Sequence, residues 1–213
     1  MRFLNRVDAG RQLAAGLTEY ANRPEVLVLA LPRGGVPVAH EVAVHLRVPL
    51  DVFIVRKLGV PGHPELAMGA IAPGGVEVLN HDVIQDLGIE TTVVQQIATR
   101  ERLELERRDR IFRGTREPLV VRDRIAILVD DGLATGSTME AAIVALRRMG
   151  PDKIVGAVPV GPPETCERMG RLADRFICLT KPLRLNAVGQ WYDDFSQTTY
   201  DEVRRLLTTP TAT

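Results

Sequence analysis

Five short apolar runs, separated by stretches with helical spacing, constrain the fold of this 213-residue chain more than any other feature of its sequence. The runs are VLVLAL (26–31), LDVFIV (50–55), RIAILVDD (124–131), KIVGAVPV (153–160) and RFICLT (175–180). Strands that are apolar on both faces are typical of a parallel sheet covered by helices on both sides. We therefore expect a doubly wound, mainly parallel α/β sheet in a three-layer arrangement.

The segments between the runs supply the expected helices. Residues 91–113 are predicted to form a charged helix with Glu and Arg spaced for (i, i+4) pairs, and residues 137–150 a helix with one apolar stripe. Two segments differ from this pattern. LGVPGHPELAMG (58–69) is rich in Gly and Pro and is predicted to be a mobile loop. AMGAIA and GVEVLN, within residues 67–80, are predicted to form a hairpin joined at Pro73-Gly74.

Composition excludes some classes of function. The chain has 27 basic and 27 acidic residues, and this balance gives no electrostatic case for binding nucleic acid or a membrane surface. No segment has the long apolar run of a membrane span, and the N-terminus lacks the apolar run of a signal peptide. The two cysteines, Cys166 and Cys178, lie in no CxxC pair, as expected for a reduced, cytoplasmic protein.

The third apolar run leads into ILVDDGLATGSTM (127–139), which places two acids directly before a turn rich in Gly and hydroxyl groups. Residues 135–138 begin the next helix, so their backbone N–H groups lack helical partners and, with the helix dipole, suit a phosphate. The Lys of a nucleotide-triphosphate loop and the GxGxxG of a dinucleotide site are both absent. The turn is therefore predicted to bind the phosphate of another kind of ligand.

Asp130 and Asp131 would repel that phosphate unless they bind another part of the same ligand. Carboxylates accept hydrogen bonds, and the vicinal hydroxyls of a sugar donate them. A ribose 5-phosphate fits, with its phosphate in the turn and its diol against the acids, and a Mg²⁺ held by waters and substrate oxygens would offset the charge. The alternative is a strand-ending turn whose acids only cap a helix.

ILVDDGLATGSTM closely resembles the signature with which type I phosphoribosyltransferases bind phosphoribosyl pyrophosphate (PRPP): an apolar strand, two acids and a short turn with T-G-S/T. LPRGGVPVA, VRKLG-PG-PELA-GA and VGQWY-DFSQ are similar to elements of a group of small bacterial members, and the resemblance covers about residues 24–181. It implies transfer of ribose 5-phosphate from PRPP to a nitrogenous acceptor, a nucleobase, with release of pyrophosphate and with Mg²⁺ as cofactor. It also implies a core over residues 1–180, a small C-terminal hood segment over residues 181–213, and a homodimer.

The resemblance implies a role for each matched residue. Asp130 and Asp131 would hold the ribose diol and the Mg²⁺. The 5-phosphate would lie on the backbone of the turn formed by Leu133, Ala134, Thr135, Gly136, Ser137 and Thr138.

The pyrophosphate would contact Arg33 and the Gly34 amide of the PRGG turn, and a cis peptide is expected there, at Leu31-Pro32 or Pro32-Arg33. Arg56 and Lys57, at the end of the neighbouring strand, would reach the same group, and the loop 58–69 would close over the site. Arg33 and Lys57 would act in catalysis by stabilising the departing pyrophosphate. From the residues alone, Arg56 and Lys57 could also be a solvent-reaching pair at a sheet edge.

One position differs from the family pattern. Oxopurine enzymes carry a third acid in this turn as a base, and Ala134, which cannot move a proton, occupies that position here. Either the acceptor needs no base at that point, or the loop 58–69 supplies it, with Glu65 and His63 as the candidates.

The acceptor is expected under the hood, where NAVGQWYDDFSQ (186–197) concentrates aromatic residues. Trp191 is the predicted acceptor-binding residue, whereas Tyr192 and Phe195 either stack on the acceptor or close a small accessory core. The alternative function is a PRPP- or nucleotide-sensing regulator that performs no chemistry. The neutral net charge and the absence of a winged-helix extension count against a regulator that acts on nucleic acid. The presence of Arg33, Arg56, Lys57 and the Gly-Pro loop favours an enzyme.

Overall fold

The computed structural model describes residues 2–211, without the side chains of residues 64 and 65. A parallel sheet with the strand order β2-β1-β6-β7-β8 forms its centre. The strands of this sheet are β1 (Val26–Ala30), β2 (Leu50–Val52), β6 (Ile125–Val129), β7 (Lys153–Val160) and β8 (Arg175–Thr180). Each of the five predicted apolar runs contains one of them, although the run at 50–55 is extended only as far as residue 52.

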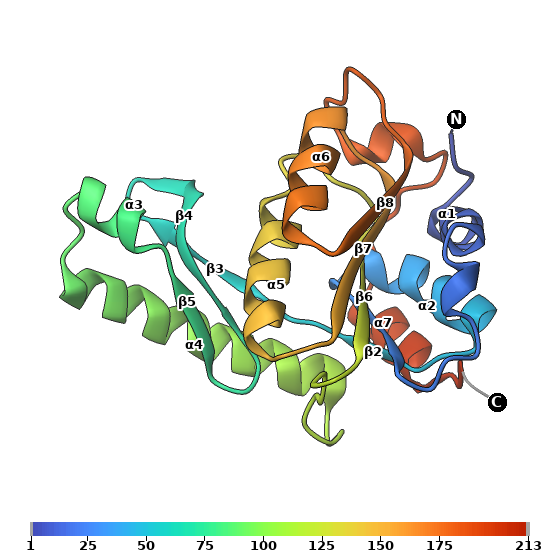
Figure 1. The fold of residues 1–213 in the computed structure, drawn as a ribbon, viewed down its shortest axis with the longest axis horizontal. Coiled ribbons are helices and arrows are strands. Elements are labelled where there is room, and N and C mark those ends of the chain that lie inside the picture. Colours follow the sequence, from blue (N-terminus) through green and yellow to red (C-terminus); the bar gives the residue numbers. More distant parts are fainter. Residues whose placement is uncertain (1, 212–213) are drawn as a thin grey trace.

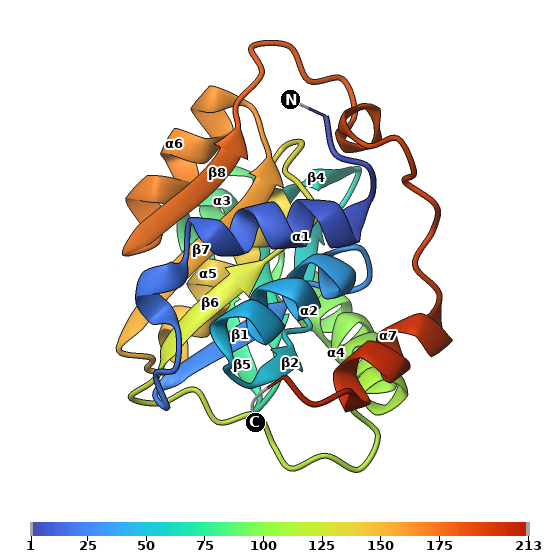
Figure 2. The ribbon, with the colours of Figure 1, turned by 90° about the vertical axis from the view of Figure 1, so that its right-hand side faces the viewer.

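Helices cover both faces of the sheet, as Figures 1 and 2 show. One face is covered by α1 (Arg6–Ala15), α2 (Gly35–Leu46) and α7 (Tyr200–Thr208), and the other by α5 (Ser137–Arg148) and α6 (Pro163–Leu172). Alternate residues of β1 enter the two hydrophobic clusters: Val28 packs toward α2, whereas Leu29 packs toward α5. A strand buried in this way must be apolar at every position. The predicted three-layer, mainly parallel fold is confirmed.

A second, antiparallel sheet projects from the core (Figure 1). It consists of β3 (Arg56–Val60), β4 (His63–Ala72) and β5 (Val76–Leu79), followed by the short helix α3 (His81–Asp86). We call residues 56–86 the arm. The long helix α4 (Thr91–Arg113) runs along the arm back to the core and has the predicted bounds.

The prediction of a mobile loop over residues 58–69 is wrong, because most of this segment belongs to the β3–β4 hairpin. Three of its apolar side chains, those of Leu58, Val60 and Met68, are buried in the cluster that also contains Val94 of α4. The Gly and Pro residues that suggest a loop serve the strand pairing instead: Gly62 lies in the turn, Gly59 at the irregular β3–β4 pairing, and a Cβ on Gly69 would lie 2.4 Å from the carbonyl oxygen of Val78 in β5. The predicted hairpin within residues 67–80 is confirmed as the β4–β5 pair.

The C-terminal segment divides into two parts beyond β8. Residues 186–198, which include the short 3-10 helix η2 (Val188–Trp191), lie beside the N-terminal segment. From here on, the name hood refers to residues 186–198 alone and no longer to the whole predicted segment 181–213. Phe3 pairs with Tyr192 there as an isolated parallel bridge. After the hood, the chain continues into α7, which packs on α2 and α4 (Figure 2).

A 3-10 helix, η1 (Thr18–Tyr20), connects α1 to β1. Within residues 2–211, no helix has the length and the apolar character needed to cross a membrane.

Candidate functional site

The candidate site lies where β1 and β6 end side by side. The two strands are parallel neighbours with Ala30 opposite Val129, and the amide of Leu31 donates to the carbonyl of Val129 over 2.9 Å. The PRGG turn after β1 therefore lies against the acid pair after β6, although about 100 residues separate them in the sequence. The Pro32-Arg33 peptide is cis, at one of the two positions expected for it.

Two glycines allow this close approach. A Cβ atom on Gly34 would lie 2.0 Å from Oδ2 of Asp131, and a Cβ on Gly35 would lie 2.7 Å from the carbonyl oxygen of Val129 and 3.2 Å from Oδ1 of Asp130. Any side chain at Gly34 would therefore displace the Asp131 carboxylate. The carboxylates of the acid pair therefore pack directly against the backbone of Gly34 and Gly35.

The acid pair is an electrostatically costly arrangement within the fold. The backbone amide of Asp131 donates to Oδ1 of Asp130 over 2.8 Å. Burial raises the pKa of Asp130 well above its ordinary value, and the neighbouring carboxylate of Asp131 raises it further. Burial also raises the pKa of Asp131, although the Arg6 guanidinium opposes this effect. Hydrogen-bond donors from a ligand would offset the cost of holding these oxygens away from water.

Arg6, which the sequence did not predict, is the positive partner of this pair. Its Nε and Nη2 atoms both lie 2.8 Å from Oδ2 of Asp131. Its Nη1 donates to the carbonyl of Ser196 over 2.7 Å, and its guanidinium carbon lies 3.9 Å from the centre of the Phe195 ring. Arg6 thus joins the start of α1, the acid pair and the hood.

The turn after the acids leads directly into helix α5. Gly136 is the residue before the helix and has φ of +76°, a left-handed conformation that favours glycine. The hydroxyls of Thr135 and Ser137 lie 3.2 Å apart at the start of the helix. The amide of Leu133, in contrast, donates to the carbonyl of Val160 over 2.8 Å, and the Leu133 side chain is buried. The amides of residues 134–138 are therefore the better candidates for binding an anion.

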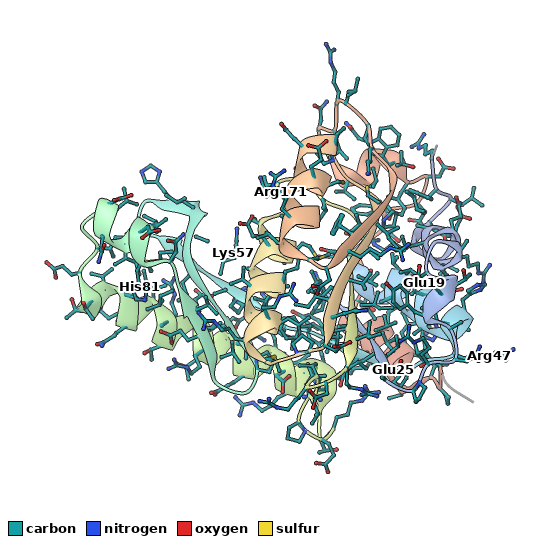
Figure 3. The ribbon with its side chains drawn as sticks, viewed as in Figure 1. Glu19, Glu25, Arg47, Lys57, His81 and Arg171 are labelled. Atoms are coloured by element: carbon teal, nitrogen blue, oxygen red, sulfur yellow. The ribbon has the colours of Figure 1, made fainter. Side chains whose placement is uncertain are left out.

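The predicted basic residues do not all point to the same place. Lys57 of β3 donates from Nζ to Oγ of Ser137 over 3.0 Å, and Figure 3 shows it in the space between the arm and α5. Arg56 instead pairs with the buried Glu101 of α4 at an Nε–Oε2 distance of 2.8 Å. The guanidinium carbon of Arg33 lies 4.9 Å from the centre of the Tyr200 ring. Lys57 is thus the predicted cation that the structure brings to the turn.

A cavity of about 820 Å³ opens between the arm and α5 and includes the predicted phosphate-binding turn in its wall. Thr135 and Ser137 line one side, with Arg168 of α6, and apolar residues of the arm such as Val78 line the other. The Arg168 guanidinium also donates to the carbonyl of Thr135, a further contact that the sequence did not predict.

The hood aromatics divide between two roles. Tyr192 is fully buried against Phe3 and the partly buried Phe195, so the expectation of a small accessory core is confirmed for Tyr192. The Tyr192 hydroxyl donates to the carbonyl of Asp131 over 2.6 Å. Trp191 is only partly buried and lines a separate cavity of about 230 Å³ with Arg2, Arg184 and Gln190.

The two candidate bases, Glu65 and His63, belong to β4, and Ala134 belongs to the turn after the acid pair. The side chain of Glu65 lies outside the described side chains, His63 is exposed at the start of β4, and Ala134 is exposed in the turn.

The donor atoms fit a Mg²⁺ ion that is bound largely through a substrate. Among the described residues, no group of three or more His, Cys, Asp and Glu side chains could hold a metal ion. One oxygen of each carboxylate is already engaged, by Arg6 on Asp131 and by the Asp131 amide on Asp130. The remaining oxygens suit Mg²⁺, which keeps several waters and binds through one or two carboxylates and substrate phosphates.

Comparisons with known proteins identify the family of the chain. The family model described as the phosphoribosyl transferase domain matches residues 65–181. Two curated proteins of Mycobacterium tuberculosis, from strains CDC 1551 / Oshkosh and H37Rv and provisionally named phosphoribosyl transferases, are each 49% identical over 205 residues, which is 96% of this chain. The chain spans about half the length of these relatives, 46% of each.

Solved structures show the same fold. The crystal structure of the TT1426 protein from Thermus thermophilus is 40% identical in sequence, superimposes with a TM-score of 0.89, and covers 97% of this chain and 98% of its own. The AQ2163 protein of Aquifex aeolicus, at 15% identity and a TM-score of 0.50, covers 86% of this chain and 78% of its own and shows the fold alone. The match to the domain family extends over more than half of the chain and contains both the acid pair and the turn. The chain belongs to the phosphoribosyl transferase domain family.

Proposed function

We propose that this chain is a phosphoribosyltransferase that transfers the ribose 5-phosphate of PRPP to a nitrogenous acceptor, a nucleobase, and releases pyrophosphate. The observation that carries the proposal is the packing of the PRGG turn on the acid pair, which is so close that a Cβ atom added to Gly34 would lie 2.0 Å from Oδ2 of Asp131. The packing brings the PRGG turn, the two carboxylates and the start of α5 to one edge of the sheet, which supports the proposal that the turn binds pyrophosphate and the helix start binds the 5-phosphate. Ligands of open α/β sheets bind at this edge.

The ribose 5-phosphate half of PRPP is assigned to β6 and the turn that follows it. The amides of residues 134–138 and the hydroxyls of Thr135 and Ser137 bind the 5-phosphate at the positive end of the α5 dipole. Asp130 and Asp131 accept hydrogen bonds from the ribose hydroxyls. These donors replace the water that burial removes from the two carboxylates.

The pyrophosphate half is assigned to the PRGG turn and to β3. A nitrogen lone pair of the acceptor forms a bond to C1 of the ribose while the bond from C1 to the pyrophosphate oxygen breaks, and the acceptor then loses its extra proton. Arg33, the Gly34 amide and Lys57 stabilise the charge on the leaving group. Arg56, predicted for the same role, is left out of the proposal because its guanidinium pairs with the buried Glu101. Asp130 and Asp131 would hold a Mg²⁺ ion together with the substrate, and the ion would supply further charge neutralisation for the pyrophosphate.

The acceptor is assigned to the hood. Trp191 is the proposed acceptor-binding residue because it is a partly buried indole on a cavity of the hood. Glu65 and His63 stay the proposed candidates for a base, since Ala134 can exchange no proton. A homodimer is proposed from the family resemblance.

The test is pyrophosphate release from PRPP and Mg²⁺ across a panel of purine and pyrimidine bases, with EDTA to remove the metal. Release with one base, and its loss with EDTA, supports the transferase. Asp131→Asn should weaken PRPP binding at least tenfold, and unchanged affinity would contradict the assignment of Asp131 to the diol.

A second function is favoured by one observation, the absence of an acid at Ala134. A PRPP-sensing regulator needs the sugar-phosphate site but no base. Binding of PRPP without pyrophosphate release by any base would favour that regulator over the enzyme.

A further inference from the structure

We propose that Arg6 is a positioning residue that fixes the Asp131 carboxylate for the ribose diol and so sets the preference of the site for ribose over deoxyribose. The inference rests on the proposed function, because it assumes that Asp131 binds the diol. It adds the N-terminal segment to the binding site, 125 residues away in sequence from the acid that it orients.

The contact between Arg6 and Asp131 holds the carboxylate in one orientation. Both Nε and Nη2 of Arg6 lie 2.8 Å from Oδ2, the oxygen that also faces the Gly34 backbone. Among the described residues, no N–H group donates to the other oxygen, Oδ1. Asp131 therefore uses Oδ2 for the contact with Arg6, and its Oδ1 is the atom that can accept a hydrogen bond from a ligand hydroxyl.

Arg6 is itself held too firmly to act as a mobile counter-ion. Its side chain is only 11% exposed, and it donates to the carbonyl of Ser196 while its guanidinium lies on the Phe195 ring. A planar guanidinium fixed by three partners has little freedom left to lose when the ligand binds. The carboxylate that it holds is preorganised in the same way.

Preorganisation of the Asp131 carboxylate affects how strongly the site discriminates between ribose and deoxyribose. A site built to bond a hydroxyl rejects the analogue that lacks it, because the buried acceptor is then left without a partner. This rejection depends on the acceptor staying in place, since a carboxylate free to rotate can reach water instead. Loss of Arg6 should therefore reduce the discrimination between ribose and deoxyribose more than it reduces the affinity for the phosphate.

Arg2 provides a matched control. It also links the N-terminal segment to the hood, with Nη2 donating to the carbonyl of Tyr192 over 3.1 Å and Nε 3.0 Å from Oδ1 of Asp193. It makes no contact with Asp131 among the described residues. Arg2→Met removes a tether of the same segment without touching the diol site.

The experiment measures dissociation constants by calorimetry for PRPP with Mg²⁺, ribose 5-phosphate and 2-deoxyribose 5-phosphate. Arg6→Met is expected to weaken PRPP binding about tenfold, the size of a lost charge-assisted contact, and to bring the ribose-to-deoxyribose affinity ratio close to one. Arg6→Lys should recover part of the affinity but leave the ratio reduced, because one ammonium cannot replace the planar fork. Arg2→Met should keep both quantities within about twofold of the wild type, a difference of under 0.5 kcal/mol.

The outcomes separate this inference from the proposed function. A wild-type ratio in Arg6→Met, with PRPP binding intact, overturns the inference and leaves the proposed function standing. Equal losses in Arg6→Met and Arg2→Met also overturn it, because they show a tether and not a positioning contact. If Arg6→Met does not fold, as judged by its melting curve, a wild-type ratio in Arg6→Lys overturns it. Failure of the wild type to bind PRPP rejects both proposals.

Discussion

The contact between Gly34 and Asp131 makes a sharp prediction for the substitution Gly34→Ala. Gly34 has φ of −60° and ψ of −33°, so its backbone suits alanine and no conformational strain is expected. The added Cβ would lie 2.0 Å from Oδ2 of Asp131 and 2.7 Å from its Cγ. The whole cost of the substitution should therefore come from one side chain.

The size of the displacement sets the magnitude. Ordinary van der Waals contact begins at 3.4 Å, so the Oδ2 atom must move by about 1.4 Å. A shift of that size breaks the 2.8 Å contacts with Arg6. Overpacking of this kind costs about 1–3 kcal/mol, and each kcal/mol lowers the melting temperature of a chain this long by about 2–4 °C.

A double-mutant cycle isolates the cause. Melting temperature and urea unfolding are measured for the wild type, Gly34→Ala, Asp131→Ala and the double variant. In the Asp131→Ala background, Gly34→Ala should cost little, which gives a coupling free energy of about 1–3 kcal/mol. Gly170→Ala in α6 is the matched control, because its Cβ would come no closer than 3.9 Å to a neighbour and alanine favours the helix.

The result that refutes the reasoning is an equal loss of stability from Gly34→Ala in both backgrounds. Such a result would place the cost of the substitution in the backbone of the turn. A second measurement, ribose 5-phosphate binding by calorimetry, should show at least a tenfold loss for Gly34→Ala, since the acid assigned to the diol is displaced.

Three other substitutions test separate parts of the structure. His40→Leu should stabilise the protein by about 1–3 kcal/mol in urea unfolding at pH 7.5, since both ring nitrogens are buried without a hydrogen bond. Burial lowers the pKa of His40, so the wild type loses stability as the pH falls below about 6.5, and the advantage of His40→Leu should widen toward pH 5.5. Glu101→Gln should cost about 1–3 kcal/mol in the same assay by removing the carboxylate that Arg56 contacts at 2.8 Å. Gly136→Ala should weaken ribose 5-phosphate binding about tenfold or more in calorimetry, because φ of +76° costs alanine about 1–2 kcal/mol and its Cβ would lie 2.6 Å from Thr165.

Local sequence patterns predicted the central layers correctly because each pattern has a local physical cause. Strands buried on both faces must be apolar at every position, so residues 125–129 could be recognised without knowledge of their neighbours. Helix α4 ends at Arg113, followed by Gly114 with φ of +59°, and such an ending is visible in the sequence as a glycine after the last periodic residue.

The arm shows where local patterns mislead. Residues 58–69 combine several Gly and Pro residues, which predict a loop by composition. Their apolar residues Leu58, Val60 and Met68 become informative only when α4 is present to cover them. The β3–β4 pairing is also irregular near Gly59, which breaks the strict alternation that identifies a strand from sequence.

The site divides in the same way between local and long-range causes. The acids, the turn and Gly136 are consecutive in the sequence, so their arrangement follows from one strand end and one helix start. The packing of Gly34 on Asp131 depends on β1 and β6 being neighbours, and the Arg6 contact depends on where α1 crosses the end of the sheet. No spacing rule connects these positions.

The acid pair raises the question of why a fold would bury two carboxylates where their mutual repulsion and lost hydration oppose ionisation. Stability alone does not favour the arrangement, because one Arg6 offsets only one of the two charges. The packing of the turn also does not favour stability, because only residues without a side chain, Gly34 and Gly35, allow the carboxylates to lie against it. Both features make sense together if the missing stabilisation comes from a ligand that donates hydrogen bonds to the acids and places its phosphate on the adjacent helix start. The unfavourable electrostatics of the pair therefore support the proposed ligand, whose hydroxyl groups would donate hydrogen bonds to the acids.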